Sequence, residues 1–425
     1  MRNASISPSS IELPFARAMA RGAVLASLAV ASMAAFAGDD SDDGWSRPDR
    51  SAVVYTESNV ATPGGNTILG YSRDRGGRLV PLPGSPYSTR GTGVRDPSLA
   101  LGPFDSDQLI ITNPEHTLLF AVNPGSNTVA VFRIHADGSL QHVAGSPFPS
   151  GGANPVSVGL AKDTLVVVNK AMDPAQPNSK TPGYASFRIS PSGQLSPIAT
   201  SIISVAPGTS PSQALVPANA RFAFGSDFLG GTLQSFVVQP DGSLTQNLPQ
   251  SVADAPFSGS AAPHLALGLA AHPTRPIVYA GLVTISKVAV YQYDENGVLS
   301  FVRAVDDSGA GVCWIRVSSD GTRMYTSNTG DNSISVYDTS DPFKPVQIQR
   351  LVMKGAGSSF QLELDPSGRS LFAISQRAST TVPLGQGSNL HVLNVRKDGR
   401  IYETEHSPVA LPVPADIRPQ GLATF

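Results

Sequence analysis

A short phrase, Gly-X-Leu or a close variant, recurs along almost the whole chain and constrains its fold more than any other feature. The copies are Gly77-Arg78-Leu79, Gly138-Ser139-Leu140, Gly193-Gln194-Leu195, Gly242-Ser243-Leu244, Gly297-Val298-Leu299 and Gly399-Arg400-Ile401, with Lys344-Pro345-Val346 in the remaining position. The last residues of successive copies are 61, 55, 49, 55, 47 and 55 residues apart. A period near 50 residues, built from short strands, is typical of propellers and arrays, because each unit needs neighbours to bury its faces.

The composition agrees with a ring of short strands. The 425 residues include 40 Gly and 36 Pro, too many for long helices but suitable for many turns. A chain of this length would normally suggest two or three domains. A closed ring of blades is one domain, however, so we expect a single propeller over residues 51–425.

Each repeat has the same internal order of strands and turns, which the sixth unit shows best. An inner strand, Trp314–Val317, leads through the hairpin signal Ser319–Thr322 into a second strand, Met324–Asn328. A polar turn then precedes an alternating third strand, Ser333–Tyr337. Corresponding pairs are predicted at Leu118–Asn123 with Thr128–Ile134, Leu165–Asn169 with Tyr184–Ile189, Phe222–Asp227 with Thr232–Val238, Ile277–Gly281 with Val288–Tyr293, and Ser370–Ser375 with Leu390–Val395.

The two ends of the chain complement each other. The first unit, Ala52–Tyr55 with Thr67–Tyr71, has no inner strand before it, and the last unit is followed by Arg418–Ala423, which is similar to the inner-strand segment Pro263–Leu267. We therefore predict an all-β, seven-bladed β-propeller, closed by pairing of the N- and C-terminal strands around a solvent-filled axis. Closure removes the free sheet edges that invite aggregation.

The N-terminus has the pattern of an export signal. Arg17 and Arg21 precede an apolar run, Gly22–Phe36, and Ala35-Phe36-Ala37 matches a small-X-small cleavage site. Residues 1–37 are thus predicted to be a signal peptide, although an uncleaved tether is the alternative. Residues 38–50 form an acidic, flexible linker by composition. The run is too short for a stable membrane span, so we expect an exported protein, periplasmic or extracellular.

Charge and cysteine content exclude several classes of function. The chain has a net charge of −2, and removing residues 1–37 takes away three Arg and one Glu, which leaves a net charge of −4. Without a basic stripe, nucleic acid is not an expected partner. The single cysteine, Cys313, cannot form an internal disulfide and is expected to be a small core residue.

One mouth of the propeller axis is the default ligand site, because inner strands start there and second strands end there. The second-strand ends are Glu57, Asn123, Asn169, Asp227, Gly281, Asn328 and Gln376-Arg377, and the inner-strand starts are Asn154, Ser212, His264, Ser358 and Arg418. These side chains are rich in oxygen and include two guanidinium groups and one imidazole. They suit a small polar or anionic ligand.

Several repeat-level motifs carry a family resemblance over about Val53–Phe425. They are Gly145-Ser146-Pro147-Phe148, Pro263-His264, His272-Pro273 leading to Val278-Tyr279-Ala280, Asp320–Asn328, and Asp365-Pro366-Ser367-Gly368. The chain resembles the lactonase-like seven-bladed propellers, of the 6-phosphogluconolactonase and carboxymuconate cyclase type. The resemblance implies hydrolysis of a small lactone. Enzymes of this family commonly carry Asn-Glu after the aromatic strand of blade five, where this chain has Gly281-Leu282.

Lactone hydrolysis needs a base for water and donors for the developing oxyanion, and the mouth offers both. His264 is the predicted catalytic base. Arg377 and Arg418 are predicted to bind the substrate through their guanidinium groups. Asp227 is a second predicted catalytic residue, with an Asx turn as its structural alternative. Asn123, Asn169 and Asn328 are predicted substrate-binding residues, although their equivalent positions equally suit turn chemistry.

No cofactor or metal is expected. Ca²⁺ coordination by the amides with Asp227 and Glu57 is an alternative that no spacing demands. The scattered histidines and the absence of HExxH and CxxC motifs argue against zinc, and no phosphate-binding or nucleophile-elbow motif is present. Arg316 and Glu363 lie mid-strand in neighbouring inner strands and are expected to pair as a structural ion pair.

A non-enzymatic propeller that binds a ligand or a protein partner is the rival interpretation. It is favoured by the missing Asn-Glu pair and by a mouth dominated by neutral amides. Two long second-to-third-strand loops, Ala171–Pro182 and Gln376–Ser388, would then be the partner-binding segments, because insertions of this length are often functional.

Overall fold

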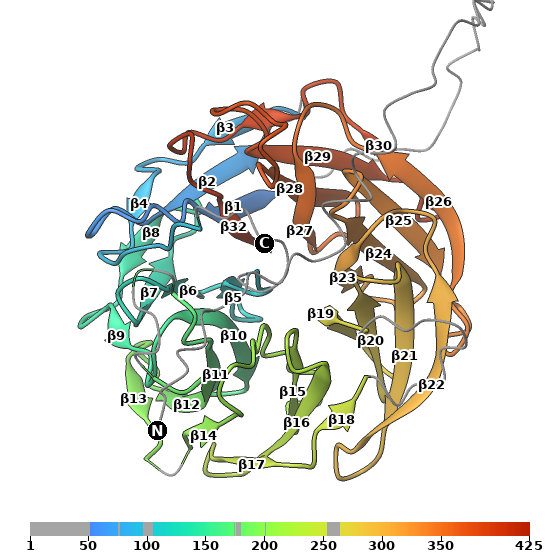
Figure 1. The fold of residues 1–425 in the computed structure, drawn as a ribbon. Helices are drawn as coiled ribbons and strands as arrows, with labels where there is room; N and C mark the ends of the chain where they lie inside the picture. The colour runs from blue at the N-terminus through green and yellow to red at the C-terminus, as the bar shows by residue number, and fades with distance from the viewer. Residues whose placement is uncertain are drawn as a thin grey trace, which may run out of the picture. The chain divides into compact units, whose positions relative to one another are not determined.

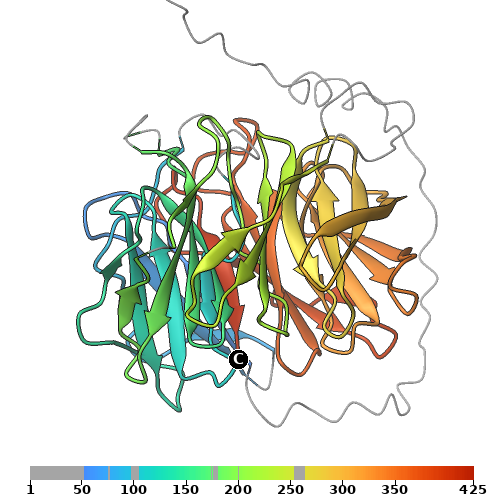
Figure 2. The same cartoon turned by 90° about the horizontal axis from the view of Figure 1, so that it is seen from below.

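The protein is a ring of seven antiparallel sheets, as the all-β seven-bladed prediction requires (Figure 1). The computed structural model describes residues 52–74, 77–96, 105–173, 175, 180–199, 201–252 and 264–425, and no helix occurs among them. The predicted signal peptide and linker fall on residues 1–50, which lie outside the described residues. Seen from the perpendicular direction, the sheets stand upright around the axis (Figure 2).

The strands follow one pattern from blade to blade. Blade 1 contains β1 (Val53–Glu57), β2 (Thr67–Arg73), β3 (Leu79–Pro81), β4 (Tyr87–Ser88) and β32 (Gln420–Thr424). Blade 2 contains β5 (Ile110–Thr112), β6 (Leu118–Asn123), β7 (Thr128–Ile134), β8 (Leu140–His142) and β9 (Phe148–Pro149). Blade 3 contains β10 (Pro155–Ala161), β11 (Thr164–Asn169), β12 (Gly183–Ile189), β13 (Leu195–Pro197) and β14 (Ile203–Ser204). Blade 4 contains β15 (Phe222–Asp227), β16 (Thr232–Val238), β17 (Leu244–Gln246) and β18 (Gln250–Ser251).

The remaining three blades complete the ring. Blade 5 contains β19 (Ala266–Ala271), β20 (Ile277–Leu282), β21 (Lys287–Tyr293) and β22 (Leu299–Asp306). Blade 6 contains β23 (Val312–Val317), β24 (Arg323–Asn328), β25 (Ser333–Asp338) and β26 (Val346–Val352). Blade 7 contains β27 (Ser358–Leu364), β28 (Ser370–Gln376), β29 (Asn389–Val395), β30 (Ile401–Glu403) and β31 (Val409–Ala410).

The recurring glycine makes the turn that leads to the outer strand. In all six copies the glycine has a positive φ, between 79° and 88°, a region that favours glycine. The same turn also joins blades, because its carbonyl accepts a hydrogen bond from the preceding blade. The Tyr55 hydroxyl donates to Gly138 O at 2.5 Å, and the Tyr325 hydroxyl donates to Gly399 O at 3.0 Å. The repeat therefore fixes both the fold of a blade and its contact with the next.

Apolar side chains of adjacent blades form the core between them. Tyr55 and Ile68 of blade 1 pack with Ile110 and Phe132 of blade 2. Corresponding clusters fill the interfaces between blades 2 and 3, 3 and 4, 4 and 5, 5 and 6, and 7 and 1. Each fully buried side chain of this size contributes about 1.5–3 kcal/mol through removal from water.

The C-terminal strand closes the ring, which confirms the predicted closure. β32 pairs antiparallel with β1, with Val54 opposite Thr424 and Tyr55 opposite Ala423. It is the inner strand of blade 1 and contacts the inner strands β27 and β5 on its two sides. Residues from both ends of the chain thus form one sheet.

The axis differs from the predicted solvent-filled channel, because residues 105–108 cross it. Asp105, Ser106 and Asp107 are buried, and this segment bonds to four blades. Its partners are Lys170 and Val158 of blade 3, Ser212 of blade 4, Arg316 of blade 6 and Gln361 of blade 7. The long connection between blades 1 and 2 therefore fills the axis at this level, and the expectation of continuous solvent was wrong.

Candidate functional site

We call the end of the propeller axis where the inner strands start and the second strands end the strand-start mouth. Buried charged side chains meet there. The guanidinium of Arg418, just before β32, lies 2.9 Å from Asp96 Oδ2 and 3.4 Å from Asp105 Oδ1. Lys170, which directly follows β11, donates from Nζ to Asp105 O at 2.6 Å. Asp227 at the end of β15 is close enough to Lys170 to influence its pKa. We call Asp96, Asp105, Lys170, Asp227 and Arg418 the mouth cluster.

The mouth cluster contains groups with shifted pKa values. Burial lowers the pKa of Lys170 to about 7, and the Asp105 and Asp227 carboxylates only partly oppose this shift. Burial also raises the pKa of Asp227, against the lowering effect of the backbone N–H groups of Ser210 and Gly230. Ionisable groups that are buried beside specific partners often mark functional sites, since catalysis needs pKa values near the working pH.

Three buried polar atoms beside the cluster have no hydrogen-bond partner among the described residues. They are Arg418 Nη1, Gln376 Oε1 and Glu57 Oε2. They belong to one neighbourhood, because Gln376 donates to Pro419 O and Glu57 pairs in register with Gln420. Burial raises the pKa of Glu57 well above its usual range, so this carboxyl favours its neutral form. Unsatisfied buried groups of this kind are costly unless water or a ligand bonds to them.

The structure places the sequence-predicted residues in different surroundings. Asp227 and Arg418 come together in the mouth cluster. Asp227 also accepts backbone N–H groups from Ser210 at 2.7 Å and Gly230 at 3.0 Å, as its Asx-turn alternative requires. Arg377 lies at the same end of blade 7, but its Nε donates to Val382 O at 2.7 Å, within its own loop.

The three asparagines are bonded mainly to nearby turns and strands. Asn123 donates to Thr128 Oγ1 at 3.2 Å, Asn169 to Ser150 O at 3.0 Å, and Asn328 to Ser333 Oγ at 3.1 Å. All three side chains are buried. These contacts occupy the amides within the fold, while both the turn alternative and a role in binding substrate stay predictions.

His264 is buried just before β19, and burial lowers its pKa, so its imidazole is neutral at neutral pH. A neutral imidazole can accept a proton, and its assignment as the base therefore also stays a prediction. Within the described residues, no three His, Cys, Asp or Glu side chains are arranged to share a metal ion, and no helix is long and apolar enough to span a membrane.

Sequence reasoning did not find Lys170, Asp96 or Asp105. The one available signal was a lysine directly after the wholly buried strand β11, where a charge needs a partner. The position of Asp105 depends on the path of a non-repeating connection, which no periodic pattern predicts. The Arg316–Glu363 pair is confirmed, with Arg316 Nε 2.7 Å from Glu363 Oε2, but the additional partner Asp107 was not anticipated.

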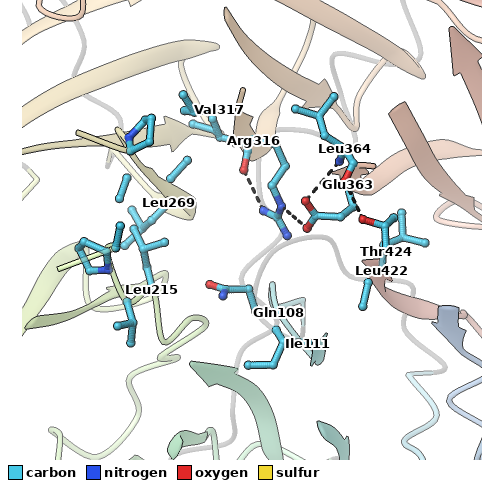
Figure 3. Close-up of a pocket in the computed structure, with 18 of the residues that line it drawn as sticks. Gln108, Ile111, Leu215, Leu269, Arg316, Val317, Glu363, Leu364, Leu422 and Thr424 are labelled. Atoms are coloured by element: carbon cyan, nitrogen blue, oxygen red, sulfur yellow. Dashed lines mark hydrogen bonds and ion pairs between the residues drawn. The ribbon is translucent and has the colours of Figure 1, made fainter. Parts of the chain in front are cut away.

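The opposite mouth, where the inner strands end, contains a cavity of about 490 Å³ (Figure 3). Arg316 and Glu363 meet in it beside Gln108, and aliphatic side chains such as Leu215 and Leu269 form its walls. The predicted site residues do not line this cavity.

Blade 7 contains a Ser-His-Glu series with the hydrogen-bond order of a hydrolytic triad. Ser375 Oγ lies 3.0 Å from His391 Nε2, and His391 Nδ1 lies 2.8 Å from Glu403 Oε1. Ser375 and His391 are fully buried, and the Ser375 hydroxyl is within 2.9 Å of Gly387 O. These side chains bond to one another and to Gly387 O within the sheet, so the series joins β28, β29 and β30.

Replacing Glu403 by Gln is expected to destabilise the protein by about 1–3 kcal/mol at neutral pH, because a buried charge-assisted network is broken. Burial acts to raise the pKa of Glu403, but bonds from His391, Lys354 N–H and Ser407 outweigh it and lower the pKa. The stabilisation is therefore present above the usual carboxyl pKa and is lost as the pH falls through the lowered value. Urea unfolding from neutral to acidic pH checks this, with the exposed Glu405→Gln as control. An equal effect of both substitutions would contradict the structural role.

Comparison with known proteins agrees with this architecture. The model of the family "Lactonase, 7-bladed beta-propeller" matches residues 268–389, which extend from blade 5 to the start of β29. The protein is a seven-bladed β-propeller, and its residues 268–389 are similar to the lactonase family. No curated protein matches its sequence.

Solved structures similar to this propeller share its fold at low sequence identity. A candidate 6-phosphogluconolactonase from Bacteroides uniformis is 16% identical, with a TM-score of 0.65, and the match covers 88% of this chain and 100% of that one. The periplasmic gluconolactonase of Pseudomonas aeruginosa is 17% identical, with a TM-score of 0.63, and the match covers 86% and 99% of the two chains. At these identities the likeness establishes the fold alone.

Proposed function

We propose that this lactonase-like propeller hydrolyses a small lactone at the strand-start mouth. The observation that carries the proposal is the mouth cluster, in which Asp105 lies between two cationic side chains with complementary roles. Lys170 has a pKa of about 7 and can act as a base near neutral pH. Arg418 keeps one buried guanidinium nitrogen without a partner among the described residues, which is a donor for an oxyanion.

The reaction can be written with these two groups. The neutral amine of Lys170 removes a proton from water as the oxygen attacks the lactone carbonyl carbon. Arg418 Nη1 donates to the oxyanion that forms. The ring C–O bond then breaks, and the Lys170 ammonium returns the proton to the leaving alkoxide, which gives a hydroxy acid. General-base catalysis of this kind typically contributes about 10²–10⁴ in rate.

The departure from the family pattern in blade 5 supports a base elsewhere. A side chain at Gly281 has no room, because a Cβ there would lie 2.8 Å from Cys313 O. Leu282 is fully buried in the core. The family's Asn-Glu pair therefore cannot be accommodated by simple replacement, and Lys170 offers a base from blade 3. The lactonase family model and the gluconolactonase name of one structural neighbour support a sugar lactone as the substrate class.

The test measures kcat/KM on a panel of aldonolactones and muconolactones for variants of two arginines, Arg418 and Arg377, which lie at the same end of the ring. We expect Arg418→Met to lower kcat/KM by about 10²-fold, the usual cost of one oxyanion donor. Arg377→Met is the matched control and should change the rate little, because its Nε is bonded to its own loop. His264→Ala in the same series tests the base predicted from the sequence.

Loss of folding must be separated from loss of catalysis. Arg418→Met leaves Asp96 and Asp105 without their cation, so the double variant Arg418→Met/Asp96→Asn is measured beside it. A folded double variant with wild-type turnover would refute the role of Arg418. No turnover by the wild-type protein on any lactone of the panel would refute the proposed activity.

The second candidate function is a propeller that binds a polar ligand or a protein without catalysis. It is favoured by the neutral amide of Gln376 and the neutral carboxyl of Glu57 beside Arg418, since these groups can hold a ligand but supply no base. Thermal stabilisation by a lactone or sugar acid without product formation would support it.

Export of the protein is part of the proposal for either function. N-terminal sequencing of protein recovered from cell fractions tests cleavage after Ala37.

A further inference from the structure

We propose that the cavity at the strand-end mouth is a second ligand site, which binds a small alkylammonium cation through Glu363. This cavity is separated from the mouth cluster by the segment 105–108, whose first three residues are buried. The inference does not depend on lactone hydrolysis, because it concerns other residues at the opposite end of the axis.

The contacts of Arg316 leave Glu363 as the side chain with spare hydrogen-bonding capacity. Arg316 Nη1 and Nη2 donate to the two oxygens of Asp107, at 2.6 and 2.9 Å, and Nε donates to Glu363 Oε2 at 2.7 Å. Nη1 also donates to Ile315 O at 2.8 Å. Arg316 has thus used four of its five N–H groups. Among the residues that the structure describes, Glu363 otherwise accepts only the N–H of Leu364, at 3.2 Å, although a carboxylate can accept about four hydrogen bonds.

The charges of this group do not balance. When all three groups are ionised, Arg316 carries one positive charge and Asp107 and Glu363 carry two negative charges, so one negative charge remains. Burial raises the pKa of Glu363, and the Arg316 guanidinium opposes this shift, so a second cation beside Glu363 would further favour its charged form. Asp107 is fully buried and holds the guanidinium in a bidentate pair, whereas the Glu363 side chain is 27% exposed. The uncompensated charge is therefore the one that a ligand can reach, and a cation compensates it.

The side chains of the cavity walls determine which group attached to the cation fits the cavity. Leu215, Leu269, Ile315 and Leu422 provide an aliphatic lining around the carboxylate. The rim adds no cation from His272, because burial lowers the pKa of its imidazole and keeps it neutral. About 490 Å³ lies within the usual range of small-molecule sites. An ammonium group with a short aliphatic chain matches both the Glu363 carboxylate and the aliphatic lining, whose side chains Leu215, Leu269 and Leu422 are labelled in Figure 3.

Calorimetric titration with three probes of equal chain length tests this assignment: hexylammonium, hexanol and hexanoate. We expect hexylammonium to bind at least about tenfold more tightly than hexanol, and hexanoate to bind least, because only the cation compensates Glu363. Glu363→Gln should remove the preference for the cation while it keeps an acceptor for Arg316. The exposed Glu295→Gln, which lines a neighbouring hollow on the same face, is the matched control and should keep the preference.

Equal binding of hexylammonium and hexanol would overturn the proposal, as would absence of binding by the wild-type protein. An unchanged preference in a folded Glu363→Gln variant would place the cation elsewhere and would also overturn it. Retention of lactone hydrolysis in Glu363→Gln is expected, so failure of this inference is distinguishable from failure of the proposed function.

Discussion

A chain that ends at Pro419 is expected to be insoluble or unfolded, whereas a chain that ends at Thr424 is expected to fold. The shorter chain lacks β32, which is the inner strand of blade 1 and pairs with β1. Leu422 and Ala423 are buried against blades 7 and 2, respectively. Their loss exposes two apolar faces, and the loss of β32 exposes the inner edge of β1.

The free energy of unfolding that is lost with β32 is expected to be comparable with the whole stability of a domain. Removing one buried leucine side chain costs about 2–5 kcal/mol, and the missing strand adds unmade backbone hydrogen bonds to this. Because folded domains are stable by only about 5–15 kcal/mol, cooperative folding should be lost. Soluble yield and urea unfolding of the two chains provide the measurement. The control chain lacks only Phe425, whose ring stacks on Tyr55. A soluble, cooperatively unfolding protein without β32 would contradict closure by the terminal strand.

Replacement of Lys170 by Met should lower kcat for the preferred lactone by about 10²–10⁴, if its amine is the base. Lys180→Met is the matched control, because Lys180 is exposed in the loop after β11 and touches no member of the mouth cluster among the described contacts. Equal activity in the two variants would exclude Lys170 as the base and would return that role to His264.

The same substitution has an effect on stability that is independent of catalysis. The folded protein releases the Lys170 proton near pH 7, whereas the unfolded chain keeps it up to an ordinary value near 10.5. The unfolded state therefore binds more protons between these values, and stability should rise with pH across this window. In Lys170→Met this rise should disappear. Urea midpoints from neutral to alkaline pH measure it, and an unchanged slope would show that the amine is not buried as described.

The repeat made most of the fold predictable because one local feature recurs in six of the seven blades. The glycine of each copy adopts a backbone conformation that other residues rarely adopt, so the turn could be read from the sequence before its neighbours were known. Closure was predictable for a related reason. Arg418–Ala423 had the pattern of an inner strand and no other partner than the incomplete first unit.

The site was less predictable because two residues of the mouth cluster come from a segment outside the repeat. Asp96 and Asp105 lie in the connection between blades 1 and 2, whose path across the axis no period describes. Asn123, Asn169 and Asn328 were expected at the mouth because their strands end there, yet their amides mainly bond to nearby turns and strands. Strand position predicts where a Cα lies, but hydrogen bonding within the fold decides what its side chain contacts.

The pH dependence of kcat for the preferred lactone, in the wild-type protein and in Lys170→Met, tests the central claim most directly. If the Lys170 amine is the base, the wild-type rate should rise with pH through about 7, as this amine loses its proton. The variant should have a low rate without this rise. Wild-type turnover that does not change across this range, or a variant with the same profile as the wild type, would contradict the assignment of the mouth cluster as the hydrolytic site.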